Sequence, residues 1–321
     1  MNITGSINKS IVITPNSSKQ RIDNFLFKSL KKIPKSMIYR SLRTGRIKIN
    51  QKKVRPYYKL KVNDCITLHA ISIEIKKKKI FLKKSVINLF LKNILFEDKY
   101  LIIFNKPHGF AVHGGSGINY GVIEIFRNIR QELIYLELVH RIDKETSGIL
   151  ILAKKRSILR KMHENLRNKK IHKEYLALLH GHWLKKNTII NLPLLKKKGI
   201  NQKKKVCVHA QGKPAITKFK VNQYFYNTTL ISIIPVTGRT HQIRVHTSQF
   251  GHPVVFDKKY GNYKIEKKNI SKKNTRLLLH AYKIFFLHPK NNKKIFIIAP
   301  LDEQFKKLLK IFSKKNNFYN F

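Results

Sequence analysis

The chain has 321 residues, of which 68 are lysine or arginine and 16 are aspartate or glutamate, so its formal net charge is +52. The two cysteines, Cys65 and Cys207, are too few for a disulfide scaffold, and no apolar run is long enough to cross a bilayer. Residues 1–19 also lack the apolar core of a signal peptide. We therefore expect a cytoplasmic protein of about two domains that binds a polyanion, most simply a nucleic acid.

Part of the lysine excess has a simpler explanation than function. Lysine, isoleucine and asparagine are abundant together, as an A/T-rich genome would produce on solvated surfaces. The arginines are fewer and lie in more specific places, so they carry more information about binding than the lysines do.

The first 70 residues divide into a leader and a small folded unit. Residues 1–19 are expected to form a flexible leader. In residues 20–70, apolar side chains at helical spacing predict one helix starting near Arg21. A second helix is expected between Pro34, which breaks the chain, and Gly45, which stops the helix. Short β-strands are expected over the rest of the unit.

This unit resembles the S4 RNA-binding module in three features: an R-I-D-N-F-L start, a basic second helix and a G-R-I-K-I-N segment. It departs from that module where Asn50-Gln51 and Asn63-Asp64 replace turns that usually contain glycine, which asparagine can absorb because it tolerates left-handed φ. The same pattern also fits a generic helical cap with surface arginines. The resemblance implies that five basic residues contact RNA: Arg21, Lys35, Arg40, Arg43 and Arg46.

Residues 71–90 alternate lysine with apolar residues, so we expect a basic linker there, followed by a larger domain over residues 91–321. In that domain the apolar runs are short, rich in β-formers and separated by turn residues, which predicts mostly strands. Lysine-rich stretches at 196–205 and 264–273 are expected to be exposed loops.

The segment V-H-R-I-D-K-E-T-S-G over residues 139–148 is the most distinctive part of the sequence. An apolar run over residues 149–153 follows it and predicts a buried strand. Asp143 therefore lies in a polar loop braced by a core strand, where catalytic groups concentrate. Histidine, arginine and lysine surround this aspartate, and positive charge favours the ionised carboxylate. On the residues alone, Asp143 fits a catalytic group as well as it fits a structural residue, which would be an ion-pair partner or a loop cap.

This segment resembles the signature of the pseudouridine synthase family that modifies large-subunit ribosomal RNA. Other segments of that family occur in the expected order, and the resemblance covers about residues 20–310. They are N-K-P-H-G at 105–109, K-E-Y-L-A at 173–177, P-V-T-G-R-T-H-Q-I-R-V-H at 235–246, and G-H-P and D-K-K-Y-G at 251–253 and 257–261. Residues 34–40 and 111–117 are similar to the C-type subfamily, which modifies several uridines of 23S rRNA, whereas the D-type subfamily usually differs at the second stretch.

The resemblance implies an α+β fold, in which a mixed, mostly antiparallel catalytic sheet with peripheral helices follows the small α+β S4-like domain. It also implies an enzyme that isomerises uridine to pseudouridine, acting as a monomer on 23S rRNA or on a large-subunit assembly intermediate. The N1–C1′ bond of the nucleoside breaks, the uracil turns, and C5 joins C1′, so no cofactor is required. The histidines lack the spacing of known zinc sites, so we expect no metal site.

Three residues form the implied catalytic site. Asp143 is the essential carboxylate, and three roles are open to it: attack on the base, attack on C1′ or removal of a sugar proton. Tyr175 stacks on the uracil and is a candidate acceptor for the C5 proton, with an ordinary core aromatic as the alternative. Arg244 pairs with Asp143 and holds it ionised, with a phosphate contact as the alternative.

A uridine within folded RNA must leave its stack before it can react, at a cost of a few kcal/mol. The resemblance implies that His140 and Arg141 hold the displaced RNA. Arg239 lies just before a helix expected from Thr240 to Gly251, and we expect it to bind phosphate. Two rival functions are the D-type specificity and a non-catalytic RNA-binding or ribosome-assembly factor that has kept the fold.

Overall fold

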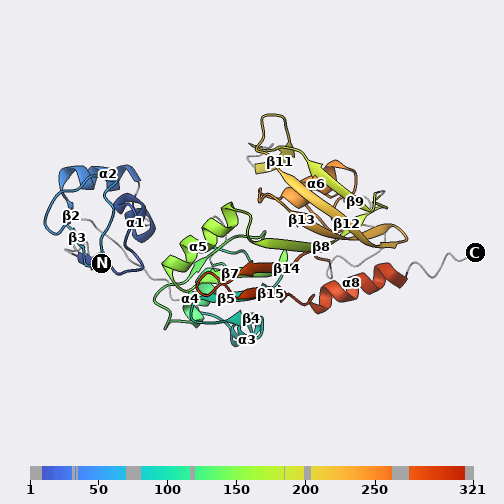
Figure 1. Cartoon of the computed structure of the whole chain (residues 1–321), viewed down its shortest axis with the longest axis horizontal. Coiled ribbons are helices and arrows are strands. Elements are labelled where there is room, and N and C mark those ends of the chain that lie inside the picture. Colours follow the sequence, from blue (N-terminus) through green and yellow to red (C-terminus); the bar gives the residue numbers. More distant parts are fainter. Residues whose placement is uncertain are drawn as a thin grey trace, which may run out of the picture. The chain divides into compact units, whose positions relative to one another are not determined.

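The computed structural model describes residues 9–30, 33, 35–69, 81–115, 120–183, 185–198, 204–261 and 275–314 (Figure 1). The chain divides into two compact units, Met1–Phe81 with Lys155–Ser157 and Leu82–Lys154 with Ile158–Phe321. In the part of the chain that the structure describes, no helix is long and apolar enough to span a membrane.

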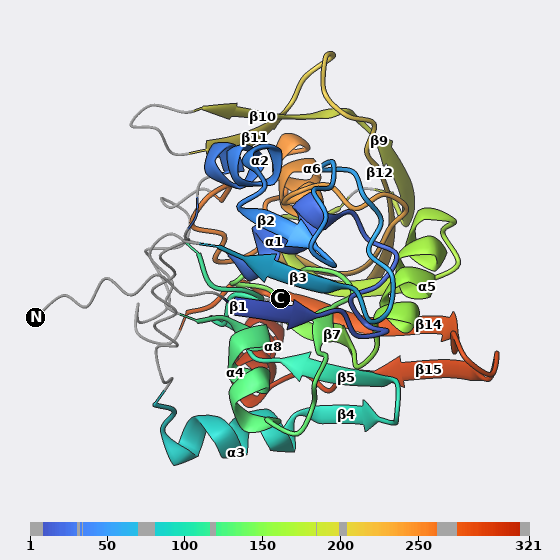
Figure 2. The ribbon, with the colours of Figure 1, turned by 90° about the vertical axis from the view of Figure 1, so that its left-hand side faces the viewer.

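The smaller unit contains a three-stranded antiparallel sheet packed against helices (Figure 2). Its elements are β1 (Lys9–Val12), α1 (Ile22–Ser29), α2 (Lys35–Thr44), β2 (Ile47–Ile49) and β3 (Cys65–Leu68), with β3 in the middle of the sheet. The apolar stripe that predicted the first helix is buried: Ile22 and Leu26 of α1 pack with Ile38 of α2 in the core of this unit.

The predicted leader over residues 1–19 differs from the structure in its second half. Residues 1–8 lie outside the described residues, but Lys9–Val12 form β1, which pairs with β3. Ile13, the next residue, is completely buried. The segment from residue 9 onward is therefore part of the fold, and the local sequence could not reveal this because the partner strand lies at residues 65–68.

The predicted basic linker over residues 71–90 also differs at its end. Residues 70–80 lie outside the described residues, but Lys84–Lys92 form α3. Phe90 of this helix is completely buried, and Val86 packs beside it one helical turn earlier. The apolar residues at the end of the predicted linker thus belong to the core of the larger unit.

Within the described residues, the larger unit is built on a ten-stranded sheet. Its main path is β4-β5-β7-β14-β8-β13-β12-β9, with β15 beside β14 and β6 beside β7. The strands are β4 (Ile94–Glu97), β5 (Leu101–Lys106), β6 (Glu137–Leu138), β7 (Ser147–Ala153), β8 (His172–His180), β9 (Asn187–Asn191), β12 (Ile216–Phe225), β13 (Thr228–Pro235), β14 (Leu279–Leu287) and β15 (Lys294–Ile298). Every pairing is antiparallel except that of β7 with β14. The predicted mixed, mostly antiparallel α+β fold is therefore confirmed.

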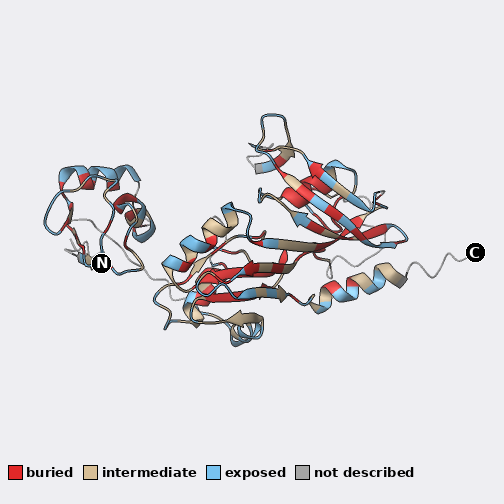
Figure 3. Ribbon diagram, in the orientation of Figure 1, coloured by how far each residue is buried: buried red, intermediate tan, exposed pale blue. Residues whose placement is uncertain are grey.

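Peripheral helices cover both faces of this sheet. They are α4 (Val122–Ile129), α5 (Arg156–Arg167), α6 (Gln242–Gln249) and α8 (Glu303–Lys314), in addition to α3. Every residue of β7 is buried (Figure 3), because Ile151 packs with α5 on one face and Leu152 packs with α4 on the other. At β8, Ala177 likewise packs with α6 and Leu178 packs with α8.

The lysine-rich stretch at 196–205 is not a simple loop. It runs through β10 (Leu194–Lys198) and β11 (Lys204–Val208), which pair with each other as an antiparallel hairpin. Residues 199–203 between these strands lie outside the described residues, as does the second stretch at 264–273.

Candidate active site

The loop that carries Asp143 joins β6 to β7 and is held by a buried lysine. Lys106, the last residue of β5, is completely buried. Its Nζ donates hydrogen bonds to the main-chain oxygens of Pro107 (2.9 Å), Phe110 (2.9 Å) and Lys144 (3.0 Å). Burial lowers the pKa of Lys106 to about 7. Because Lys144 directly follows Asp143, these hydrogen bonds fix the loop on which the carboxylate lies.

Gly148 fixes the other end of this loop. Its φ is +103°, and a Cβ at this position would lie 2.2 Å from the main-chain oxygen of Ala281 on β14. Only glycine combines this backbone conformation with this close approach of two strands. The preceding residue, Ser147, is held as well, because its Oγ lies 2.7 Å from His280 Nδ1 and accepts a hydrogen bond of 2.6 Å from Arg276.

Arg244, on α6, contacts two carboxylates. Its Nη1 lies 3.1 Å from Oδ2 of Asp143, and its Nε and Nη2 each donate a 2.7 Å hydrogen bond to Asp257. The side chain of Asp257 is fully buried and that of Arg244 is 7% exposed, whereas that of Asp143 is 21% exposed. Burial opposes the charged guanidinium, but the hydrogen bonds to Asp257 and the two negative charges outweigh it and raise the pKa of Arg244. The arginine is therefore a fixed positive charge beside Asp143.

His241 and Tyr260 form a second set of contacts around Asp143. Tyr260 Oη accepts a hydrogen bond from the main-chain N–H of Val206 (3.2 Å) and lies 2.7 Å from His241 Nδ1. Either group can donate in this pair, depending on the tautomer of the imidazole, and the other ring nitrogen is Nε2. That atom lies 3.7 Å from Oδ2 of Asp143. Burial lowers the pKa of His241, so the ring is neutral at pH 7.

Tyr175 lies on β8 at the junction of three core clusters and is partly exposed. Burial raises the pKa of its phenol, and the negative charge of Asp143 adds to the effect. The phenol therefore stays protonated at neutral pH. The three predicted residues thus lie near one another. Asp143 contacts Arg244, and the charge of Asp143 contributes to the raised pKa of Tyr175.

The other predicted contacts of the larger unit differ in exposure. Arg141 and Arg239 are exposed. The Nε of Arg239 donates to the main-chain oxygen of Pro214 (3.0 Å), and its main chain precedes α6. His140 Nε2 instead accepts a hydrogen bond from the main chain of Ile151 (3.2 Å). Burial, with the charge of a nearby lysine, lowers the pKa of His140 to about 3. One nitrogen of His140 is thus occupied within the fold.

In the smaller unit, Arg40, Arg43 and Arg46 are exposed, the first two on α2 and the third just after it. The other two predicted RNA contacts are partly engaged by neighbours. Arg21 donates two hydrogen bonds to the buried Asp23 (2.7 and 3.1 Å) and is half-exposed. Lys35 is exposed, with its Nζ 5.1 Å from the ring centroid of Phe27. The unit therefore presents a basic helix to solvent.

The sequence analysis missed four residues of the site: Lys106, His241, Asp257 and Tyr260. All four lie in segments that carried the family resemblance, so the segments were noted without a role for these side chains. Their place within these motifs was the one sign in the sequence that they matter. Their roles depend on contacts between distant parts of the chain, from β5 to the turn after α6, which the sequence does not reveal. Among the described residues, no group of three or more histidine, cysteine, aspartate or glutamate side chains could hold a metal ion.

Comparison with known proteins agrees with this architecture. Residues 100–249 match the family model for RNA pseudouridylate synthase, and residues 20–66 match that for the S4 domain. The chain belongs to the RNA pseudouridylate synthase family. The family resemblance inferred from the sequence is thereby confirmed.

Individual relatives match almost the full length of the chain. It is 52% identical to the ribosomal large subunit pseudouridine synthase C of Buchnera aphidicola subsp. Schizaphis graminum, over 93% of this chain and 96% of that protein. It is 44% identical to the protein of the same name from Escherichia coli K12, over 94% of this chain and 95% of that protein. Among solved structures, human RNA pseudouridylate synthase domain containing 4 shares the fold, with a TM-score of 0.58 and 23% identity over 70% of this chain and 95% of that chain.

Proposed function

We propose that this protein converts uridines of 23S rRNA into pseudouridine as a C-type large-subunit enzyme. The observation that carries the proposal is the contact of Asp143 with Arg244. One carboxylate oxygen lies 3.1 Å from a buried guanidinium, while Oδ1 has no hydrogen-bond partner among the described residues. Relatives that match 93–94% of the chain carry the name of this activity.

The proposed reaction conserves every atom of the nucleoside. The N1–C1′ bond breaks, the uracil turns, the C5–C1′ bond forms, and the proton lost from C5 is balanced by one gained at N1. Asp143 supplies the carboxylate beside the reacting sugar and base. Arg244 orients that carboxylate and places a fixed positive charge next to it. The residues that hold the loop and the guanidinium are themselves buried, so the geometry is set before RNA binds.

Tyr175 is proposed to stack on the uracil once the uridine has left its helix. Its raised pKa means that the phenol is protonated at neutral pH, and a protonated phenol is a poor acceptor for the C5 proton. This supports stacking over proton removal among the roles considered for Tyr175. Base–aromatic stacking of about 1–3 kcal/mol would offset part of the cost of extracting the base.

We further propose that the unit containing residues 20–70 is the RNA-binding domain and that the catalytic domain follows it from residue 82. Arg141, Arg239 and the α2 arginines are exposed, as phosphate contacts must be. The proposed substrate is 23S rRNA or a large-subunit assembly intermediate, bound by a monomer in the cytoplasm.

The proposal is tested by incubating the purified chain with an unmodified 23S rRNA transcript. Carbodiimide treatment followed by primer extension then maps pseudouridine. New stops are expected at defined uridines, and their positions separate the C-type from the D-type specificity. If no stop appears although the protein binds the transcript, the rival function of a non-catalytic assembly factor replaces the proposed one.

A further inference from the structure

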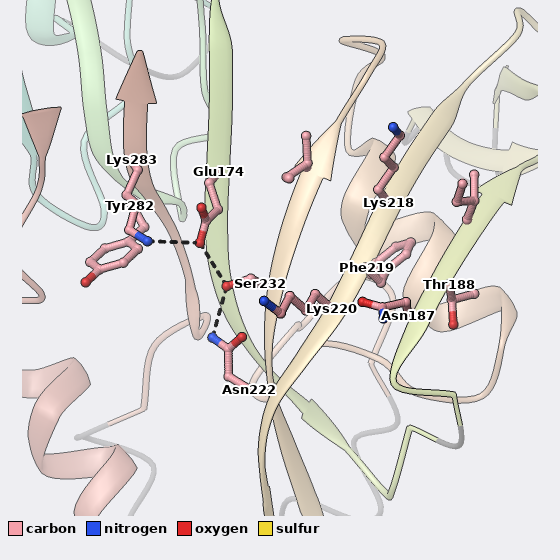
Figure 4. A pocket seen from close by; sticks show the side chains of 12 residues that line it. Glu174, Asn187, Thr188, Lys218, Phe219, Lys220, Asn222, Ser232, Tyr282 and Lys283 are labelled. Atoms are coloured by element: carbon pink, nitrogen blue, oxygen red, sulfur yellow. Dashed lines mark hydrogen bonds and ion pairs between the residues drawn. The ribbon is translucent and has the colours of Figure 1, made fainter. Parts of the chain in front are cut away.

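The larger unit has a hollow of about 830 Å³, lined by side chains of its sheet (Figure 4). Glu174 precedes Tyr175 on β8 and lines this hollow, and successive strand residues point to opposite faces. The hollow extends over β8, β13, β12 and β9. It is therefore distinct from the site around Asp143, which lies on the Tyr175 side.

Strand pairing brings polar and basic side chains together in this hollow. Lys220 of β12 pairs with Asn187 of β9 on one side and with Ser232 of β13 on the other. Lys218 lies two residues earlier on the same strand and so on the same face. Both lysines are exposed. On this face α8 packs against Leu178, which lies farther along β8 than Glu174, so the helix leaves the lysine end open.

The negative charge in the hollow is already balanced. Glu174 is the one acidic residue among the described residues that line it. Its Oε1 accepts a hydrogen bond from Ser232 (2.9 Å) and lies 3.5 Å from Nζ of Lys283 (Figure 4). No carboxylate among the described residues forms an ion pair with Lys218 or Lys220. Two positive charges therefore face solvent over a polar, concave surface.

We propose that this surface, which we call the basic sheet face (Asn187, Lys218, Lys220, Asn222 and Ser232), binds the phosphate backbone of a second segment of the substrate RNA. The proposal rests on the proposed function, which supplies a long RNA substrate. Phosphate oxygens accept hydrogen bonds from lysine, amide and hydroxyl groups, and these groups line the hollow. A large folded RNA can reach the catalytic side with one segment and the basic sheet face with another.

The test is charge reversal in the full chain. In the double variant Lys218→Glu/Lys220→Glu, affinity for a 23S rRNA transcript should fall at least tenfold at 150 mM KCl. The slope of log Kd against log salt should become less steep by about 1–2, since each phosphate contact contributes about 0.7–0.9. The control Lys84→Glu/Lys92→Glu changes the net charge equally on α3, beside β4 at the other end of the sheet, and should lower affinity less than twofold.

A second variant separates charge from folding. Lys218→Arg/Lys220→Arg keeps both charges and should bind the transcript within twofold of wild type. The proposal would be overturned if the reversal and control variants lost affinity for the transcript equally. It would also be overturned if the reversal variant lost no affinity, and the hollow would then be assigned to a protein partner. Pseudouridine is measured in the same samples. If wild type forms none, the proposed function fails; if wild type forms it and reversal does not weaken binding, only the basic sheet face fails.

Discussion

Arg244 is shared by two carboxylates, and the geometry of this sharing separates their roles. Two 2.7 Å hydrogen bonds to the buried Asp257 fix the plane of the guanidinium. Only Nη1 is then left for Asp143, at 3.1 Å. Asp257 is thus the structural partner, and Asp143, with the weaker single contact and the greater exposure, is the more accessible carboxylate, as its proposed role requires.

Asp143→Asn tests this division, since the amide nearly matches the carboxylate in shape but carries no charge. We expect the rate of pseudouridine formation to fall about 10⁴-fold or more, as for removal of an essential catalytic group. Affinity for a 23S rRNA transcript should stay within a few-fold of wild type. Single-turnover measurements with saturating protein give the rate. A rate near that of wild type would remove the carboxylate from its assigned role.

Removing the hydrogen bond between Tyr260 and His241 should lower the turnover number less than Asp143→Asn does, without changing KM. Tyr260→Phe removes the hydroxyl that lies 2.7 Å from His241 Nδ1 but keeps the ring, whose centroid lies 5.2 Å from the Arg244 guanidinium. The imidazole then loses the hydrogen bond that holds it beside Asp143, and the turnover number should fall about 2–10-fold, the value of one hydrogen bond, with KM unchanged. Tyr224→Phe removes a comparable 2.9 Å hydrogen bond to Trp183 and should not change the rate. A raised KM in Tyr260→Phe would point instead to contact with RNA.

At the scale of the strands, the parallel pairing of β7 with β14 depends on Gly148. Gly148→Ala would place a methyl group 2.2 Å from the oxygen of Ala281 at a φ of +103°. We expect a loss of about 2–5 kcal/mol in the free energy of unfolding, from strain and overpacking together. Gly109→Ala is the matched control: its φ is +86° with no atom within 4 Å of the added Cβ, so only about 1–2 kcal/mol of backbone strain applies. Urea titration measures both, and equal losses would show that the contact with β14 is not limiting.

The elements also show what local sequence can and cannot predict. The helix ending near Gly251 and the buried strand after Asp143 are both present, as α6 and β7, because periodicity and turn residues encode them locally. Strand β1 was missed because β3, its partner, is distant in the sequence. For the same reason the sequence identified Asp143 and Arg244 but assigned no role to Asp257, whose function is defined only by the arginine it touches.

For the molecule as a whole, the buried side chain of His280 predicts that the free energy of unfolding decreases at acidic pH. Burial lowers the pKa of His280 to about 4, from the ordinary 6.5 that it regains on unfolding. Between these values the unfolded chain binds the extra proton, so the free energy of unfolding is unaffected above pH 6.5 and falls by about 1.4 kcal/mol per pH unit below it. From pH 6.5 to 5, His280 should account for a loss of about 2 kcal/mol. His280→Gln should flatten this dependence in urea titrations and the exposed His113→Gln should not; equal slopes in wild type and His280→Gln would contradict the assignment.

The net charge of +52 is spread over both units, but the arginines of α2 are the part whose position suggests a specific contact with RNA. Arg40→Glu/Arg43→Glu should weaken binding of a 23S rRNA transcript about tenfold or more at 150 mM KCl and reduce the salt slope by about 1–2. The single-turnover rate at saturating protein should be unchanged, because Asp143 and Arg244 belong to the other unit. Lys59→Glu/Lys61→Glu alters the same charge at exposed positions of the same unit. If both pairs weaken binding equally, the smaller unit contributes only diffuse charge; a loss confined to the arginine pair makes α2 the element by which this unit holds its RNA.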